Sequence, residues 1–165
     1  MCCNCEAPEV KIMLDVALYD GEDGSRFYPQ KAHESDAGYD ISSAADGSVY
    51  IAPGSRILIP AGFRMALPIG YEAQIRSRSG NAFKKGLMVL NSPGTIDANY
   101  RGVVGVILYN TSDKSIEIKR GDKIAQMVIQ KLPAINMNVV DSLDETDRGE
   151  GGFGSTGVVG NEKEK

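Results

Sequence analysis

Tryptophan is absent from the sequence, histidine occurs once, and the three cysteines all lie among the first five residues. Cys2, Cys3 and Cys5 are too few for the four ligands that a structural zinc ion needs. We therefore predict that they belong to a disordered N-terminal extension, residues 1–8, with metal or redox use across an oligomer as the alternative. His33 lies in a polar loop, and we interpret it as a surface residue rather than a catalytic base.

An excess of basic charge and a long hydrophobic run are also lacking. The sequence has 18 lysines and arginines and 22 acidic residues, which gives a net charge of -4. A nucleic-acid-binding protein normally presents a basic surface instead. The longest apolar runs, such as Val103–Tyr109, are far shorter than a membrane span, and the N-terminus does not have the pattern of a secretory signal. We expect a cytoplasmic protein with no nucleic-acid or membrane partner.

Helical periodicity is nearly absent, whereas short β-branched and aliphatic runs alternate with turn residues rich in glycine, proline, asparagine and aspartate. This pattern predicts an all-β fold, a jelly-roll-like β-sandwich in one domain. One short helical turn is expected at Asn81–Lys85. The expected strands are Val10–Leu18, Ser48–Ile51, Arg56–Ile59, Glu72–Ile75, Leu87–Leu90, Val103–Tyr109, Ser115–Ile118, Lys123–Gln130 and Ile135–Val140.

The composition changes beyond Val140, first to an acidic stretch and then to a glycine-rich one. We therefore predict a β domain over residues 9–141 and a flexible glycine-rich tail over residues 142–165, which buries too little apolar surface to fold alone. The tail nevertheless contains Arg148, Phe153 and adjacent hydroxyl residues in a glycine-rich frame. An idle linker and a lid over a binding site are the two interpretations.

Three segments of the predicted domain suit phosphate chemistry, and each has a purely structural alternative. Asp40 follows an aromatic residue at the start of a strand, where it either serves a site or caps a turn. The segment Arg76–Gly80 combines guanidinium groups, hydroxyls and a glycine that suit a phosphate, or else forms a solvated basic turn. Gln126 interrupts an apolar strand, either as a site residue or as a hydrogen-bonded core glutamine.

The segment Asn91–Gly102 is too polar for a simple strand connection, and its Pro-Gly pair predicts a rigid hairpin. Asn91 offers both a donor and an acceptor to a nucleobase edge. Asp97 can act as a general base, and Tyr100 can stack on a sugar or a base.

Taken in order, these segments resemble the five motifs of the trimeric dUTP pyrophosphatases, from Ala37 to Gly157. The stretches Gly94–Gly102 and Gly151–Gly157 carry most of the specificity. The resemblance implies a jelly-roll-like homotrimer with sites shared between subunits. It also implies Mg²⁺-dependent hydrolysis of dUTP to dUMP and pyrophosphate, which keeps uracil out of DNA and supplies dUMP for thymidylate synthesis. For a phage member of the family it implies a regulatory protein partner as well.

The resemblance assigns the nucleoside side of the site to the hairpin. Asp97 matches the general base that activates the water attacking the α-phosphorus. Asn91 matches the residue that reads the uracil edge, and Tyr100 matches the aromatic that excludes a 2′-hydroxyl. The backbone that completes the uracil contacts is that of Gly94, Thr95, Ile96 and Asp97.

The phosphate side is assigned in the same way, with Mg²⁺ held by the triphosphate and waters rather than directly by protein ligands. Asp40 matches a carboxylate that acts near the metal through water, and Gln126 matches a glutamine near the α-phosphate. Arg148 matches the arginine that holds the γ-phosphate, and Phe153 matches the aromatic that covers the uracil. The remaining phosphate contacts are assigned to Arg78, Ser79, Gly80, Gly154, Ser155 and Thr156. One departure is Ser77, where the family often has proline.

Two other functions are compatible with the sequence at this point. The dCTP deaminases share the fold, but the segment Thr95–Asp97 and the complete tail motif favour phosphate cleavage. A nucleotide-gated binding protein, in which dUTP only switches contact with a partner, is not separated from an enzyme by any single residue.

Overall fold

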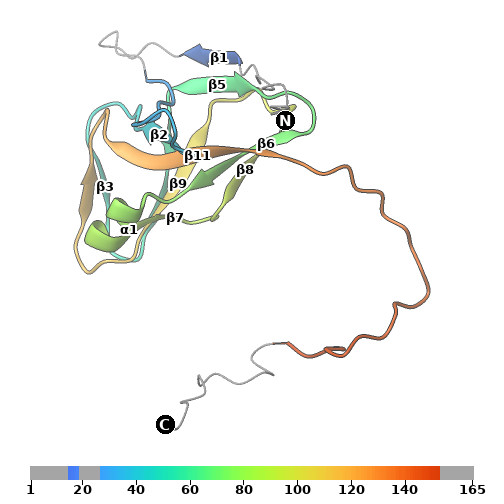
Figure 1. Cartoon of the computed structure of the whole chain (residues 1–165). Helices are drawn as coiled ribbons and strands as arrows, with labels where there is room; N and C mark the ends of the chain where they lie inside the picture. The colour runs from blue at the N-terminus through green and yellow to red at the C-terminus, as the bar shows by residue number, and fades with distance from the viewer. Residues whose placement is uncertain (1–14, 19–26, 153–165) are drawn as a thin grey trace, which may run out of the picture. The chain divides into compact units, whose positions relative to one another are not determined.

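The structure is a computed structural model that describes residues 15–18 and 27–152 (Figure 1). The chain divides into two units, Met1–Ala134 and Ile135–Lys165, and each is treated by itself. The predictions that concern Cys2, Cys3 and Cys5, and those that concern Phe153, Gly154, Ser155 and Thr156, lie outside the described residues.

The first unit is built from antiparallel β-sheets, as the sequence predicted. A four-stranded sheet has the order β2 (Tyr39–Ser42), β11 (Lys123–Lys131), β6 (Tyr71–Arg76) and β8 (Gly94–Ile96). A three-stranded sheet has the order β4 (Arg56–Pro60), β9 (Gly105–Asn110) and β7 (Leu87–Val89). Two strand pairs complete the fold, β1 (Asp15–Leu18) with β5 (Phe63–Ala66) and β10 (Ile116–Ile118) with β3 (Val49–Ile51).

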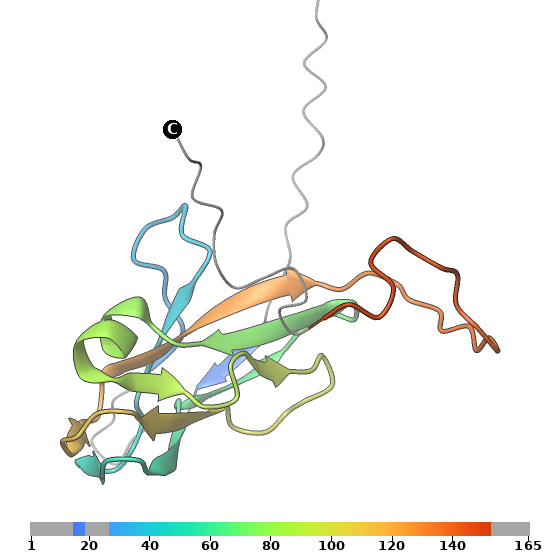
Figure 2. The ribbon, with the colours of Figure 1, turned by 90° about the horizontal axis from the view of Figure 1, so that it is seen from below.

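Every sheet of this unit contributes to one apolar core. Alternate residues of β9 are buried, which is the period-two pattern of a strand with one face toward the interior. In Figure 2 the orange β11 and the green β6 lie in one layer, and the brown β9 lies in another. Burial of each large core side chain contributes about 1.5–3 kcal/mol. The largest of these side chains include Phe63, Ile41, Ile51, Ile59, Leu87, Leu108, Ile124 and Met127.

Strand β11 fixes the arrangement on which the candidate site depends. It pairs with β2 on one side and β6 on the other, so that Gln126 lies opposite Asp40 and also opposite Arg76. A register shift between Lys123 and Ala125 interrupts the pairing with β2. The strand ladder therefore brings together three segments that are far apart in the sequence.

The predicted helical turn is present as α1 (Ser79–Lys85), which begins two residues earlier than expected. It ends at Gly86, which has φ 65° and donates its N–H to the Ala82 carbonyl. Glycine occupies this left-handed conformation without the strain that a side chain would add.

The prediction of a strand at Ile135–Val140 is wrong. No strand is assigned there, and Ile135, Met137 and Val139 are 71%, 95% and 96% exposed. The segment has the alternation of a strand, but a strand also needs a neighbouring strand to satisfy its backbone groups. Conversely, the expected strands omitted β5 and β8, which are only three or four residues long, whereas the strand start expected at Asp40 is confirmed as β2. None of the helices in the described part of the chain is long and apolar enough to cross a membrane.

Candidate functional site

A polar cavity of about 460 Å³ lies where β2, β11 and the start of α1 meet. We call it the arginine cavity. All five residues that the sequence assigned to the phosphate side within the β domain line it: Asp40, Arg78, Ser79, Gly80 and Gln126. Asp36 and Gly38, from the loop before β2, contribute further to the wall.

The carboxylate of Asp40 holds two cations at the arginine cavity. The Nε of Arg78 lies 2.9 Å from Oδ1, and the Nζ of Lys123 lies 2.7 Å from Oδ2. The Asp40 side chain is only 16% exposed, so water screens these pairs less than it would on an open surface. Asp40 therefore fixes the positions of two positive charges, and its role as a mere turn cap is excluded.

Gln126 lies against the β2 side of the arginine cavity. Its Nε2 donates to the Ser77 carbonyl at 2.9 Å, and a Cβ built on Gly38 would lie 2.6 Å from its Oε1. A side chain at position 38 would therefore displace the amide. Because Gln126 is half-buried and lines the cavity, it is not a fully enclosed core glutamine.

Ser77 anchors the turn that carries Arg78 to strand β7. Its hydroxyl oxygen accepts the N–H of Val89 on β7 at 2.9 Å. Asn81 of α1 donates to the Lys123 carbonyl at 2.9 Å, which ties the helix to β11. Serine at position 77, where the family often has proline, thus has a hydrogen-bonding role in this chain.

A second cavity, of about 280 Å³, is lined by the polar hairpin and by apolar strand residues. We call it the hairpin cavity. Its lining includes the six residues of the β domain that were predicted for the nucleoside side: Asn91, Gly94, Thr95, Ile96, Asp97 and Tyr100. Ile75, Val89 and Val103 form part of its apolar wall. Polar backbone on one side and aliphatic groups on the other suit a flat heterocycle joined to a sugar.

The hairpin is held by pairing of β8 with β6, in which Gly94 lies opposite Ile75. A Cβ on Gly94 would lie 3.1 Å from the Asn91 Nδ2 and 3.4 Å from the Ile75 Cβ, so a side chain there would press on the asparagine amide. The peptide bond between Ser92 and Pro93 is cis. The described strands thus hold the Asn91–Gly102 segment to the four-stranded sheet through β8 and β6, whereas a two-stranded hairpin within the segment, as predicted, is not formed.

The segment after the hairpin positions Tyr100 and leaves the Asp97 side chain exposed. The Tyr100 hydroxyl donates to the Val103 carbonyl at 3.0 Å. Arg101 donates to the carbonyls of Ala98 and Tyr100 at 2.7 and 2.8 Å, which closes the loop on itself. Arg101 therefore stabilises the loop, and Asp97 remains accessible to water.

Within the first unit, the two cavities have no lining residue in common. The charged phosphate-type groups and the base-type hairpin thus form two separate parts of a site. Arg148, in the second unit, is exposed and donates from its Nε to the Gly151 carbonyl at 2.8 Å.

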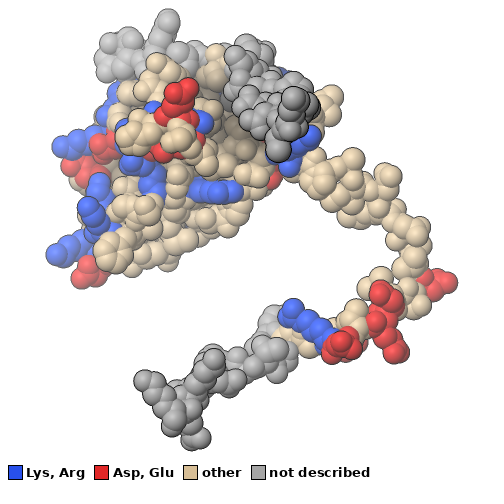
Figure 3. Space-filling model, in the orientation of Figure 1, with Lys and Arg blue, Asp and Glu red and all other residues tan. Residues whose placement is uncertain are grey.

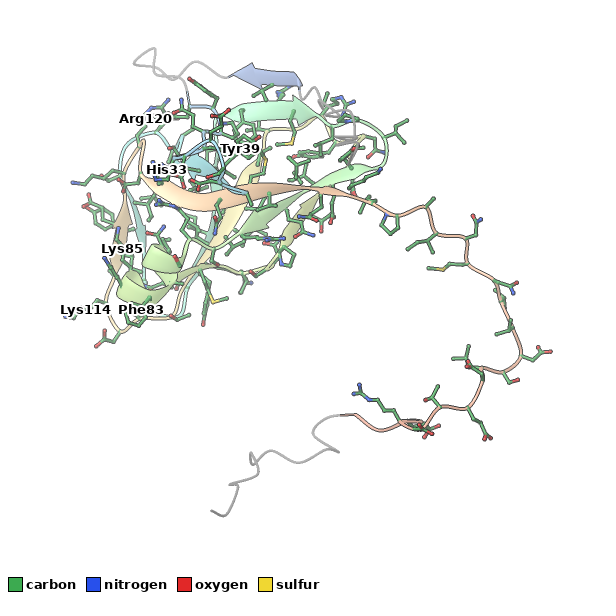
Figure 4. All side chains as sticks on the ribbon, in the orientation of Figure 1. His33, Tyr39, Phe83, Lys85, Lys114 and Arg120 are labelled. Atoms are coloured by element: carbon green, nitrogen blue, oxygen red, sulfur yellow. The ribbon has the colours of Figure 1, made fainter. Side chains whose placement is uncertain are left out.

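Sequence reasoning missed Lys123 and the apolar wall of the hairpin cavity. Lys123 was visible three positions before Gln126, but the register of β11 against β2 places it opposite Ser42, and only the folded side chains show its Nζ 2.7 Å from Asp40. Ile75 and Val89 have no chemical signature apart from their place in a strand. His33, labelled in Figure 4, is exposed as predicted, and its backbone N–H donates to Asp36 at 2.9 Å.

An antiparallel β fold with a cation-lined cavity and a separate base-sized hairpin cavity defines a nucleotide-binding protein of jelly-roll-like architecture. The family model described as dUTPase matches residues 27–157. The chain belongs to the dUTPase family, as its motifs predicted.

Two relatives illustrate the sequence similarity. The chain is 50% identical over 147 residues to the deoxyuridine 5′-triphosphate nucleotidohydrolase of Roseobacter denitrificans, covering 88% of this chain and 97% of that protein. It is 52% identical over 129 residues to the enzyme of the same name from Clostridium tetani, covering 78% and 88% respectively.

Solved structures show the same fold. A mutant of the dUTPase of Staphylococcus bacteriophage 80alpha, solved with dUpNHpp, is 29% identical in sequence and superposes with a TM-score of 0.76, covering 88% of this chain and 99% of that one. A dUTPase variant from phage phi11 of S. aureus superposes with a TM-score of 0.70 at 27% identity, covering 81% and 99%, and is described as coordinating a structural Mg(II) ion.

Proposed function

We propose that the arginine cavity and the hairpin cavity together form the site at which this chain hydrolyses dUTP to dUMP and pyrophosphate. The observation that carries the residue assignments is the sorting of the predicted residues. Those of the β domain that were assigned to phosphate all line one cavity, and those of the β domain that were assigned to the nucleoside all line the other. Membership of the dUTPase family supplies the reaction.

The hairpin cavity binds the uracil and the deoxyribose. Asn91 and the backbone of Gly94–Ile96 present donors and acceptors to the uracil edge, and a cytosine would leave some of these groups unpaired. The Tyr100 ring, held by its hydroxyl on Val103, packs against the sugar and leaves no space for a 2′-hydroxyl. Asp97 accepts the proton of the attacking water.

The arginine cavity binds the phosphates. The triphosphate carries about four negative charges, and attack at the α-phosphorus moves further charge to the leaving pyrophosphate. Arg78 and Lys123 are already held at the cavity by Asp40, so their charge needs little rearrangement when that build-up occurs. Gln126 and the N–H groups near Ser79 and Gly80 orient the oxygens around the phosphorus.

The residues present fit a Mg²⁺ ion bound chiefly by substrate. Within the described residues no three His, Cys, Asp or Glu side chains gather, and the two oxygens of Asp40 each contact a cation. Asp40 would contact such an ion through water, in a site otherwise built from phosphate oxygens and waters. When bound, Mg²⁺ supplies neutralisation of the triphosphate charge.

The active unit is proposed to be a homotrimer whose sites are shared between subunits. The separation of the two cavities supports this arrangement, because the Asp97 base must reach the phosphates that the arginine cavity holds. The tail completes the site: Arg148 contacts the γ-phosphate and Phe153 covers the uracil. Closure would also exclude water from the reacting groups.

The substitution Asp97→Asn tests the assignment most sharply. We expect binding of dUpNHpp to stay within about twofold of wild type while dUTP hydrolysis falls by about 10²–10⁴, the usual contribution of a positioned base. Comparable turnover in the variant would defeat the assignment of Asp97 as base.

A second role is suggested by the phage neighbours, since the 80alpha protein is described as controlling transfer of virulence genes by a G-protein-like mechanism. If this chain also has a regulatory protein partner, Asp97→Asn should still support that interaction when dUTP is bound, and loss of the interaction together with turnover would reject it. The cytoplasmic location remains a prediction.

A further inference from the structure

The preference for dUTP over UTP depends, under the proposed function, on how firmly the Tyr100 ring is held. The two nucleotides carry the same triphosphate, so the lysine and arginine side chains on the face of the first unit shown in Figure 3 attract both equally. The Tyr100 side chain lines the hairpin cavity and is 42% exposed. A side chain with so much freedom excludes a hydroxyl group only when its surroundings fix its position.

Hydrogen bonds fix the two ends of the Tyr100 residue. Its hydroxyl group donates to the Val103 carbonyl at 3.0 Å, so the side chain reaches forward along its own chain. At the backbone, its N–H donates to the Asp97 carbonyl at 3.1 Å, and its carbonyl accepts a hydrogen bond from Arg101 at 2.8 Å. Between these anchors the ring lies over Gly102.

Gly102 provides the space that the outer end of the ring occupies. A Cβ built on Gly102 would lie 2.5 Å from the Cζ and 2.9 Å from the Cε2 of Tyr100, and nearer still to its hydroxyl oxygen. Carbon atoms that are not bonded to each other pack best at about 3.5–4.0 Å. The ring and a side chain at position 102 therefore cannot both keep these positions.

Two other reasons for a glycine at position 102 do not apply. Gly102 is not among the described glycines with a positive φ, such as Gly86 and Gly121, so an alanine would meet no left-handed strain. Of the described residues in this loop, Tyr100 and Val103 line the hairpin cavity but Gly102 does not, so the glycine is not needed for close approach of a ligand. The contact with the ring accounts for the glycine.

We propose that Gly102 is a positioning residue for sugar recognition, because its missing side chain lets the Tyr100 ring reach the Val103 carbonyl and stay where it excludes a 2′-hydroxyl. The inference rests on the proposed function and deepens it. A methyl group at position 102 meets the far end of a side chain, which can rotate away, rather than a rigid part of the fold. Gly102→Ala therefore displaces the ring and leaves the β domain folded.

The ratio of two nucleotide affinities tests the proposal without turnover. The analogue dUpNHpp and its ribose counterpart are titrated by calorimetry into wild type and Gly102→Ala with Mg²⁺ present. We expect the preference for the deoxyribose analogue to fall about tenfold in the variant, because the displaced ring no longer excludes the 2′-hydroxyl. The matched control is Asn99→Ala, at an exposed neighbour in the same loop, which should keep the wild-type preference. An unchanged preference in Gly102→Ala would overturn the proposal.

A double variant shows whether the effect acts through the ring. In the Tyr100→Ala background the added methyl group meets no ring, so Gly102→Ala should change the preference there by less than about twofold. Any loss of Tm caused by Gly102→Ala should likewise be recovered in the double variant. An equal fall of the preference, or an equal loss of Tm, in both backgrounds would show that Gly102 acts independently of Tyr100 and would reject the proposal.

A crystal structure of Gly102→Ala separates this inference from the proposed function. The Tyr100 hydroxyl should have left the Val103 carbonyl, and a hydrogen bond of the wild-type length would contradict the displacement. If the wild-type chain neither binds dUpNHpp nor hydrolyses dUTP, the proposed function is lost, but that structure still decides whether Gly102 holds the ring. If the wild-type chain hydrolyses dUTP and Gly102→Ala keeps its preference, the inference is rejected and the enzyme assignment stands.

Discussion

Asp40 shows how one residue organises the charged half of the site. It binds Arg78 and Lys123 through different oxygens, at 2.9 and 2.7 Å, and its own side chain is 16% exposed. Two cations in such proximity would repel each other without the shared carboxylate. The carboxylate therefore makes a concentrated positive charge stable before the phosphates arrive.

Substitution of Lys123 tests this arrangement. Lys123→Met keeps the backbone carbonyl that Asn81 contacts but removes the ammonium group. We expect the KM for dUTP to rise about tenfold, because one charge-assisted contact is lost. Such a contact contributes about 1.5–3 kcal/mol, and a tenfold change corresponds to the lower end of that range. Steady-state kinetics measure this, with Lys131→Met at the opposite end of β11 as the control. An unchanged KM would show that Lys123 does not act on the phosphates.

Tyr100 provides the corresponding test on the nucleoside side. Tyr100→Ala removes the ring that excludes a 2′-hydroxyl, so the preference for dUTP over UTP in kcat/KM should fall by about tenfold or more. Tyr100→Phe keeps the ring and loses only the hydrogen bond to Val103, and it should retain most of the preference. A ratio that is the same in wild type and Tyr100→Ala would reject the packing role.

Among the elements, β11 and the paired strands β6 and β8 position the residues of the two cavities. The strand ladder fixes Gln126 opposite Asp40, and β8 carries the hairpin against β6. The buried core residues all precede Ile135. As far as residue 152, the second unit therefore contributes nothing to this core, and we expect its removal to leave the β domain folded.

Truncation before Arg148 separates folding from catalysis. The shortened chain should lose at least about 10²-fold in kcat/KM for dUTP, because a closed, water-excluding site cannot form. Its Tm should stay within about 2 °C of wild type, since no core residue is removed. Normal hydrolysis by the truncated protein would contradict the lid assignment, and a collapsed Tm would contradict the independence of the tail.

At the scale of the whole molecule, the proposal that subunits complete each other's sites can be tested by mixing two inactive variants. Chains carrying Asp97→Asn lack the base, and chains carrying Arg78→Ala lack a phosphate contact. Mixed and refolded in equal amounts, the two variants should regain about one quarter of wild-type activity. If each site takes Asp97 from one chain and Arg78 from another, about one site in four receives both residues intact. Activity no greater than that of the separate variants would place the whole site within one chain.

Much of this molecule could be predicted from its sequence because its patterns are local. Period-two runs predicted β4, β6, β9 and β11, and the polar segments from Asp40 to Gln126 predicted the chemically distinctive residues of both cavities but not their apolar walls. The short strands β5 and β8 were missed, since three or four residues give little periodicity. Ile135–Val140 was assigned wrongly because alternation reports a preference, whereas pairing needs a neighbouring strand. The contact of Lys123 with Asp40 could not be predicted, because it depends on how β11 pairs with β2, a strand far away in the sequence.

Release of pyrophosphate from purified protein is the most direct measurement of the central claim. With Mg²⁺ present, dUTP should be converted to dUMP and pyrophosphate, while dCTP, dTTP and UTP under the same conditions should react at least about 10²-fold more slowly in kcat/KM. Chelation of Mg²⁺ should suppress the reaction. Failure to cleave dUTP with Mg²⁺ supplied, or equal cleavage of all four nucleotides, would contradict the account.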